Sequence, residues 1–123
     1  MTPAAVPPGW PAQVHPPESP EFEHTAVSWL LDLCPPDYRA YDVLRRYPVI
    51  LARFAADHLR AAVGAARTGL AGVRADLARV VPPEAVEAAV SAYERELVRL
   101  TAAARAVALV DEALRGRRFR AKL

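Results

Sequence analysis

Apolar residues recur at alternating steps of three and four along residues 49–80, the heptad pattern of a helix that buries one seam against another helix. The ten positions are Val49, Ala52, Ala56, Leu59, Val63, Ala66, Leu70, Val73, Leu77 and Val80. A second seam follows, broken once at Asp111, and its positions are Val86, Val90, Tyr93, Leu97, Leu100, Ala104, Val107 and Leu114. Two seams joined by a short turn predict one long antiparallel, coiled-coil-like helical hairpin over residues 48–115.

The ends of the two hairpin arms are marked by residues that stop helices. Pro82 and Pro83 separate the arms, because proline lacks a backbone N–H and clashes with the preceding turn. Gly116 is a natural end for the second arm. Each arm is about 32 residues long, which corresponds to ~50 Å of helix.

A shorter helix is predicted over residues 20–34. Ser19 and Pro20 suit a helix start, and Pro35 and Pro36 end it. Its apolar face consists of Phe22, Ala26, Trp29, Leu30 and Leu33. We expect this face to pack at the open end of the hairpin, where the first arm is apolar all round. The fold class is therefore all-α, a three-helix arrangement, with residues 35–47 forming a turn and at most one helical turn after Asp42.

The first 19 residues form a proline-rich arm that can build neither a helix nor a central strand, so we expect it to be extended. Trp10 is its one large apolar group, and it either folds back on the domain or inserts into a partner. The chain thus divides into an arm at 1–19, a helical domain at 20–116 and a basic tail at 117–123.

The two flanks of the seam differ in character. On one flank, arginines repeat every seven residues at Arg53, Arg60, Arg67 and Arg74. Glu87 and Glu94 on the facing arm are expected to pair with Arg74 and Arg67. The opposite flank is small and apolar, with Ala55, Ala62 and Gly69 facing Ala89, Ala103 and Val110.

The small-residue flank predicts an interface. The short helix can cover only the open end, which leaves Ala62, Gly69 and Ala89 toward the tip for a protein partner or for a second copy in a homodimer. Gly64, Gly69 and Gly72 each cost ~1 kcal/mol relative to alanine inside a helix, so the close approach of another backbone is a reason for keeping them.

Tyrosine and charged residues are dense between residues 37 and 47. Tyr38, Arg39 and Tyr41 would be anchors of a protein interface, since tyrosine and arginine are enriched at such sites. The alternative is a connector whose tyrosines lie over the hairpin, and the sequence leaves both open.

Charge is unevenly distributed along the chain. The net charge of +2 combines a body of −3 over residues 1–114 with a terminal segment of +5 over residues 115–123. The basic residues of that segment are Arg115, Arg117, Arg118, Arg120 and Lys122. They could bind phosphates of a nucleic acid, with Phe119 available to stack, or they form a solvated end.

Catalytic and ligand-binding signatures are missing from the sequence. There is no glycine-rich phosphate loop, nucleophile elbow or metal-binding cysteine or histidine spacing, and Cys34 is the only cysteine. His58 beside Asp57 could act as a general base, but no nucleophile accompanies it. We therefore expect no cofactor, no metal and no enzymatic activity. Without a signal peptide or membrane span, a cytoplasmic protein is expected.

These observations favour a non-enzymatic helical protein-interaction module, self-associating or docking a larger protein along the hairpin. The first alternative is a nucleic-acid or ribosome-associated protein that uses the basic tail. The second is an enzyme accessory or small-ligand-binding protein with a pocket between the short helix and the hairpin, near Trp29 and Tyr47.

The segment Trp29-Leu-Leu-Asp-Leu-Cys-Pro-Pro-Asp-Tyr-Arg39, with Val43-Leu-Arg-Arg46 and Pro48-Val49, resembles small uncharacterised proteins of high-GC Gram-positive (actinobacterial) bacteria. The resemblance covers about a third of the chain. It implies a cytoplasmic bacterial protein and carries over no activity and no site residues.

Overall fold

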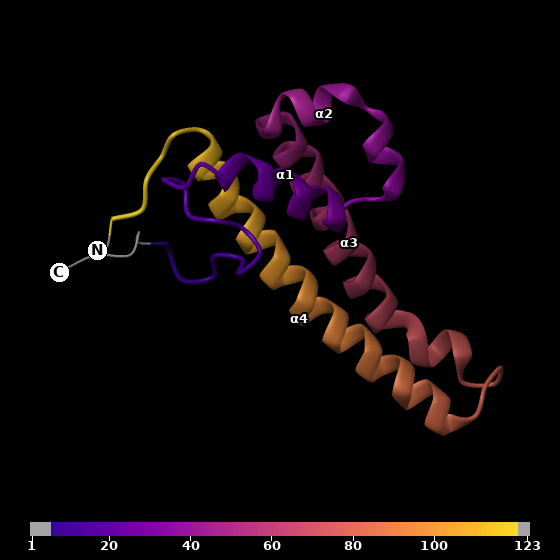
Figure 1. The fold of residues 1–123 in the computed structure, drawn as a ribbon. Coiled ribbons are helices and arrows are strands. Elements are labelled where there is room, and N and C mark those ends of the chain that lie inside the picture. The colour runs from indigo at the N-terminus through magenta and orange to yellow at the C-terminus, as the bar shows by residue number, and fades with distance from the viewer. Residues whose placement is uncertain (1–5, 121–123) are drawn as a thin grey trace.

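The computed structural model describes residues 6–120, and within that range the regular structure is helical throughout (Figure 1). Two long helices lie side by side, and the chain reverses between them at the tip farthest from the first helix. The elements are α1 (Phe22–Leu33), the 3-10 helix η1 (Pro36–Ala40), α2 (Asp42–Arg46), α3 (Pro48–Leu77) and α4 (Pro83–Leu114). The prediction of an all-helical fold with two closely packed long helices is confirmed.

Helices α3 and α4 pack along the predicted seams. Buried seam residues include Leu59, Val73, Val90 and Leu100. One predicted seam position is wrong: Val80 is 72% exposed. Helix α3 ends at Leu77, and the next residues turn before the double proline, so the heptad pattern continues in the sequence beyond the helix that could use it.

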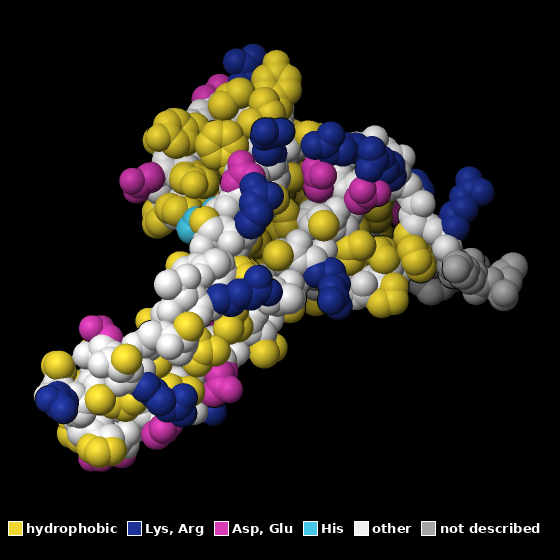
Figure 2. Space-filling view, turned by 180° about the vertical axis from the view of Figure 1, so that it is seen from behind, with side chains coloured by type: hydrophobic (Ala, Val, Ile, Leu, Met, Phe, Trp, Pro, Cys, Tyr) yellow, Lys and Arg dark blue, Asp and Glu magenta, His cyan; other side chains and the backbone are white. Residues whose placement is uncertain are grey.

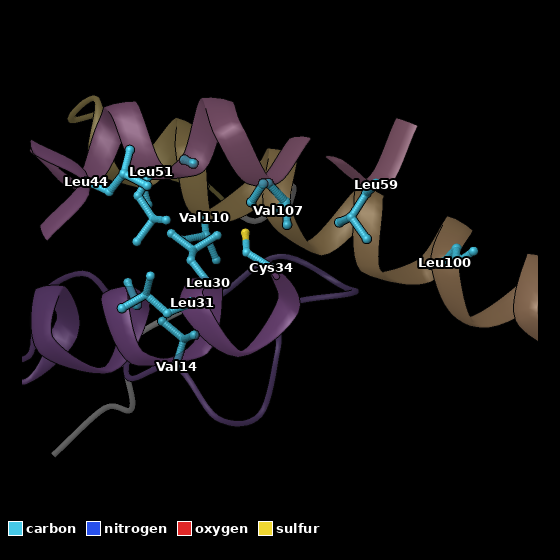
Figure 3. Close-up of a cluster of buried hydrophobic side chains, with 14 of the residues drawn as sticks. Val14, Leu30, Leu31, Cys34, Leu44, Leu51, Leu59, Leu100, Val107 and Val110 are labelled. Atoms are coloured by element: carbon cyan, nitrogen blue, oxygen red, sulfur yellow. The ribbon is translucent and has the colours of Figure 1, made fainter. Parts of the chain in front are cut away.

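The hydrophobic core is concentrated at the open end of the two long helices, where α1 packs against α3 and α4 (Figure 3). Leu30 of α1 points between the long helices toward Leu51 and Val110. The largest fully buried side chains come from all four α-helices: Leu30, Leu44, Leu51, Leu59, Val107 and Val110. Near the tip, Val73, Val86 and Val90 are buried outside this main cluster.

The described part of the proline-rich arm folds back on the helices. The indole Nε1 of Trp10 donates to the carbonyl of Val14 at 2.8 Å, and its ring lies 6.0 Å from that of Phe22. Val14 is buried in the main core. Successive turns closed by backbone hydrogen bonds replace the extended conformation that the prolines predicted. Trp10 therefore anchors the arm to α1 instead of projecting from it.

Gly69 of α3 lies under the ring of Tyr93 from α4. A Cβ atom at residue 69 would clash with that ring, so the group that approaches Gly69 is a side chain of the hairpin itself and not another backbone. At Gly64 and Gly72 a Cβ would meet no atom within 4 Å. No group within the described chain therefore approaches these two glycines closely.

Candidate interaction surface

Five large apolar side chains gather on η1, α2 and the start of α3, at the end of the molecule away from the hairpin tip. We call them the aromatic patch, and its members are Tyr38, Tyr41, Val43, Tyr47 and Phe54. The exposed fraction is 53% for Tyr41, 44% for Val43, 55% for Tyr47 and 38% for Phe54. Figure 2 shows hydrophobic side chains crowded over this end.

One buried residue, Leu44, anchors the connector that carries the aromatic patch. Leu44 is fully buried and fixes α2 on α3, which leaves its neighbour Val43 outward. Phe54 lies in the first two turns of α3, and Tyr47 is the residue directly before that helix. The short connector between α1 and α3 therefore presents its exposed apolar side chains beside the start of α3.

Tyr38 joins the connector to α3 through aromatic contacts. Its ring meets that of Phe54 edge-on, with centroids 5.7 Å apart, and lies 6.4 Å from the ring of His58. The ring centroid of Tyr41 lies 6.3 Å from that of Tyr38. Edge-to-face pairs of this kind stabilise an aromatic cluster beyond simple burial. His58 is thus a packing neighbour of the patch, while the adjacent Asp57 forms an ion pair with Arg60.

Arg39 points away from the aromatic patch. Its guanidinium lies 2.8 Å from the carboxylate of Asp32 and also donates to the carbonyl of Leu31 at 3.4 Å. These contacts connect η1 to the end of α1. Of the three predicted connector anchors, Tyr41 is the most exposed, Tyr38 is half-buried beneath it, and Arg39 is engaged within the chain.

The three residues predicted on the small-residue flank do not form one bare strip. Gly69 is covered by Tyr93, whereas Ala62 and Ala89 are half-buried. Nearer the open end, Ala55 and Val110 are fully buried in the core that α1 closes. At the open end, α1 therefore covers this flank as expected. Toward the tip, part of the flank is covered by Tyr93 of the hairpin itself.

Three arginines of the predicted polyanion site contact acceptors within the chain. Arg115 lies 3.1 Å from Asp111, and Arg117 lies 2.7 Å from Glu112. Arg118 donates to a carbonyl of α4 at 3.0 Å and stands 3.8 Å from Glu18 of the arm. Arg120 is exposed, and Lys122 lies outside the described residues. Much of the positive charge of this segment is therefore balanced locally.

Two hollows lie near the terminal segments and α1. One, of ≈ 230 Å3, opens between the arm and the end of α4 beside Trp10, Leu109 and Phe119. The other is a surface depression on α1 beside Trp29, and Tyr47 is not among its lining residues. It is not the pocket between the short helix and the hairpin, near Trp29 and Tyr47, that the ligand-binding alternative requires, because only residues of the arm and α1 line it.

Cys34 is buried in the main core, and burial raises the pKa of its thiol, against a smaller lowering by the nearby Arg39. Between residues 6 and 120, no group of three or more histidine, cysteine, aspartate or glutamate side chains is arranged to hold a metal ion. None of the helices in the described part of the chain is long and apolar enough to cross a membrane.

Comparison of the chain with protein-family models, with curated proteins and with solved structures finds no match in any of the three.

Proposed function

We propose that this protein is a non-enzymatic helical interaction module that binds another protein through the aromatic patch. The exposure of Tyr41, Tyr47 and Phe54 together at one end of the molecule is the observation that carries the proposal. Large aromatic side chains supply much of the binding energy of protein interfaces, because they bury a large area while losing little conformational freedom. An exposed apolar patch rimmed by charged residues is typical of an interaction site.

The other predicted surfaces support binding less well. In the basic tail, Arg115 and Arg117 already pair with carboxylates of α4. On the small-residue flank, Gly69 is covered by Tyr93. The aromatic patch is where large apolar side chains remain exposed together.

The proposal has two forms, in which the partner is a larger protein or a second copy of the chain. Light scattering on the wild-type protein at ~100 μM separates them, because that concentration favours even weak self-association. A dimer supports the second copy. If the protein is a monomer, a tagged form of it is used to capture the partner protein from the host.

The decisive variant is the double substitution Tyr41→Ser and Tyr47→Ser, which removes exposed rings while a serine remains a good cap for α3. Val80→Ser is the matched control, because Val80 is 72% exposed at the hairpin turn, away from the patch. We expect the double variant to lose the dimer or the captured partner and the control to keep it. Equal binding by the double variant and the wild type would refute the aromatic patch as the interface.

A further inference from the structure

A groove runs between α3 and α4 on the flank that carries the heptad arginines. Its floor consists of small or apolar side chains near the open end: Ala52, Ala56, Ala104, Val107 and Ala108. A second hollow continues it toward the tip, beside Leu97, Val98, Thr101 and Ala102. We call the two hollows together the arginine groove.

The rims of the arginine groove are positively charged. The lining residues include five arginines, Arg53, Arg60, Arg67, Arg105 and Arg115, and two aspartates, Asp57 and Asp111, giving a formal charge of +3. The two aspartates pair with Arg60 and Arg115. No carboxylate from residues 6–120 lies within 4 Å of the other three guanidinium groups. Figure 2 shows basic side chains spaced along this part of the hairpin.

Charge matching across the hairpin stops partway along it. Near the tip, Arg74 meets Glu87 of α4 at 2.8 Å. The positions of α4 that continue the heptad spacing from Glu87 are Glu94, Thr101, Ala108 and Arg115. Of these only Glu94 is acidic, and Asp111, the one carboxylate of α4 that lines the groove, pairs with Arg115. The predicted pair between Arg67 and Glu94 is not among the ion pairs of the described residues.

We infer that the arginine groove binds an acidic amphipathic helix of another protein. The alanines of its floor would let a helix approach to the 8–10 Å between axes that packed helices adopt. Acidic residues repeated every seven positions on that helix would recur at ~10.5 Å, the same interval as the arginines of α3. Helix α1 already packs against both long helices at the open end, so this hairpin accepts a third helix.

The lining of the groove favours a helix over a nucleic acid. Sequence-independent binding of single strands combines basic side chains with aromatic rings on which bases stack. No aromatic residue lines the described groove. Trp10 and Phe119 line the separate hollow at the terminal segments. An apolar floor flanked by arginines matches an amphipathic helix instead. This inference uses residues other than the aromatic patch and stands independently of the proposed function.

The probe for this inference is a labelled 21-residue peptide with leucine and alanine at heptad positions a and d and glutamate at e and g. Two matched peptides carry glutamine or lysine in place of every glutamate. Fluorescence polarisation measures binding, and circular dichroism measures the peptide's gain in helix on binding, since so short a peptide is only partly helical alone. We expect the glutamate peptide to bind the wild-type protein with a gain in helicity, and the glutamine peptide to bind about tenfold more weakly.

Charge reversal locates the binding site. The triple variant with Arg53→Glu, Arg60→Glu and Arg67→Glu should bind the glutamate peptide at least about tenfold more weakly than the wild-type protein does. The same variant should bind the lysine peptide, whose charge is opposite to that of the new glutamates. Ala108→Gln should weaken binding of the glutamate peptide and of the glutamine peptide, because the longer side chain fills the floor of the groove. The substitution should not unfold the protein, since Ala108 is exposed and glutamine keeps helix propensity high. Arg79→Glu at the hairpin turn is the matched control and should change neither peptide's affinity.

Several outcomes would overturn the inference. Equal binding of the glutamate and glutamine peptides would exclude charge recognition, and unchanged binding by the triple variant would place the peptide elsewhere. Tighter binding of an RNA or DNA duplex than of the peptide, lost in the same triple variant and steeply salt-dependent, would assign the groove to nucleic acid instead.

Discussion

Three glycines occur within α3, and their surroundings predict opposite effects of the same substitution. Gly64→Ala and Gly72→Ala should each raise the free energy of unfolding by ~0.5–1 kcal/mol, because nothing lies within 4 Å of the added methyl group and alanine favours the helix. Gly69→Ala should lower it, since the methyl group would displace the Tyr93 ring at a cost of ~1–3 kcal/mol. Chemical denaturation of the three variants tests this. A common gain at all three positions would show that Tyr93 does not rest on Gly69.

The Cys34 thiol offers a second test at the scale of one residue. Its side chain is 7% exposed and burial raises its pKa, so at pH 8 less of it is the reactive thiolate than in an exposed cysteine. We expect Ellman's reagent to react at least about a hundredfold more slowly with the folded protein than with protein unfolded in guanidinium, because reaction requires local opening. Equal rates in the two states would place the thiol at the surface.

At the scale of elements, the sequence predicted what depends on periodicity and stop residues. Ten regular heptad positions and the double proline located α3 and α4 closely, because a helix in a hairpin must repeat its apolar positions at that interval. The hydroxyl of Ser19 accepts from the N–H of Glu21 as expected for a helix start, although α1 begins at Phe22. The sequence left open whether Trp10 folds back or binds a partner, and it did not predict the turns of the arm, because proline content limits regular structure without specifying where Trp10 packs.

The seam itself is tested by two neighbouring residues of α3. Leu59→Ala should cost ~2–5 kcal/mol, because Leu59 is buried in the main core and its truncation leaves a cavity. Arg60→Ala should cost less than ~1 kcal/mol, because its ion pair with Asp57 is exposed to solvent. Thermal or chemical unfolding of both variants provides the comparison. Similar losses for the two would contradict the seam assignment.

For the molecule as a whole, the candidate surfaces could be predicted only in part. Composition pointed to the tyrosines of the connector, but spacing could not show that Tyr41 is exposed while Arg39 turns back to Asp32. The arginine repeat was visible, yet only the placement of α4 against α3 shows that Asp111, the α4 carboxylate beside these arginines, pairs with Arg115. Heptad analysis assigns positions to flanks, whereas the coverage of each flank depends on side chains such as Tyr93 that cross the hairpin.

The uneven core predicts uneven stability along the hairpin. The main cluster joins α1, α2 and the open ends of α3 and α4, whereas residues around the tip depend on a few buried valines. Amide hydrogen exchange should therefore be faster over residues 67–95 than over 48–59 and 104–114, because local opening is easier where fewer apolar contacts must break. Mass spectrometry of peptic fragments resolves these segments.

Measuring this exchange at ~1 μM and ~100 μM also tests where copies of the chain meet, since raising the concentration favours association. If copies associate through the aromatic patch, exchange should slow with concentration over residues 38–58 and stay fast over 67–95, because the patch lies at the opposite end from the tip. The double variant Tyr41→Ser and Tyr47→Ser should abolish that slowing. Protection of the tip at the higher concentration, retained in the double variant, would instead show that copies meet along the small-residue flank.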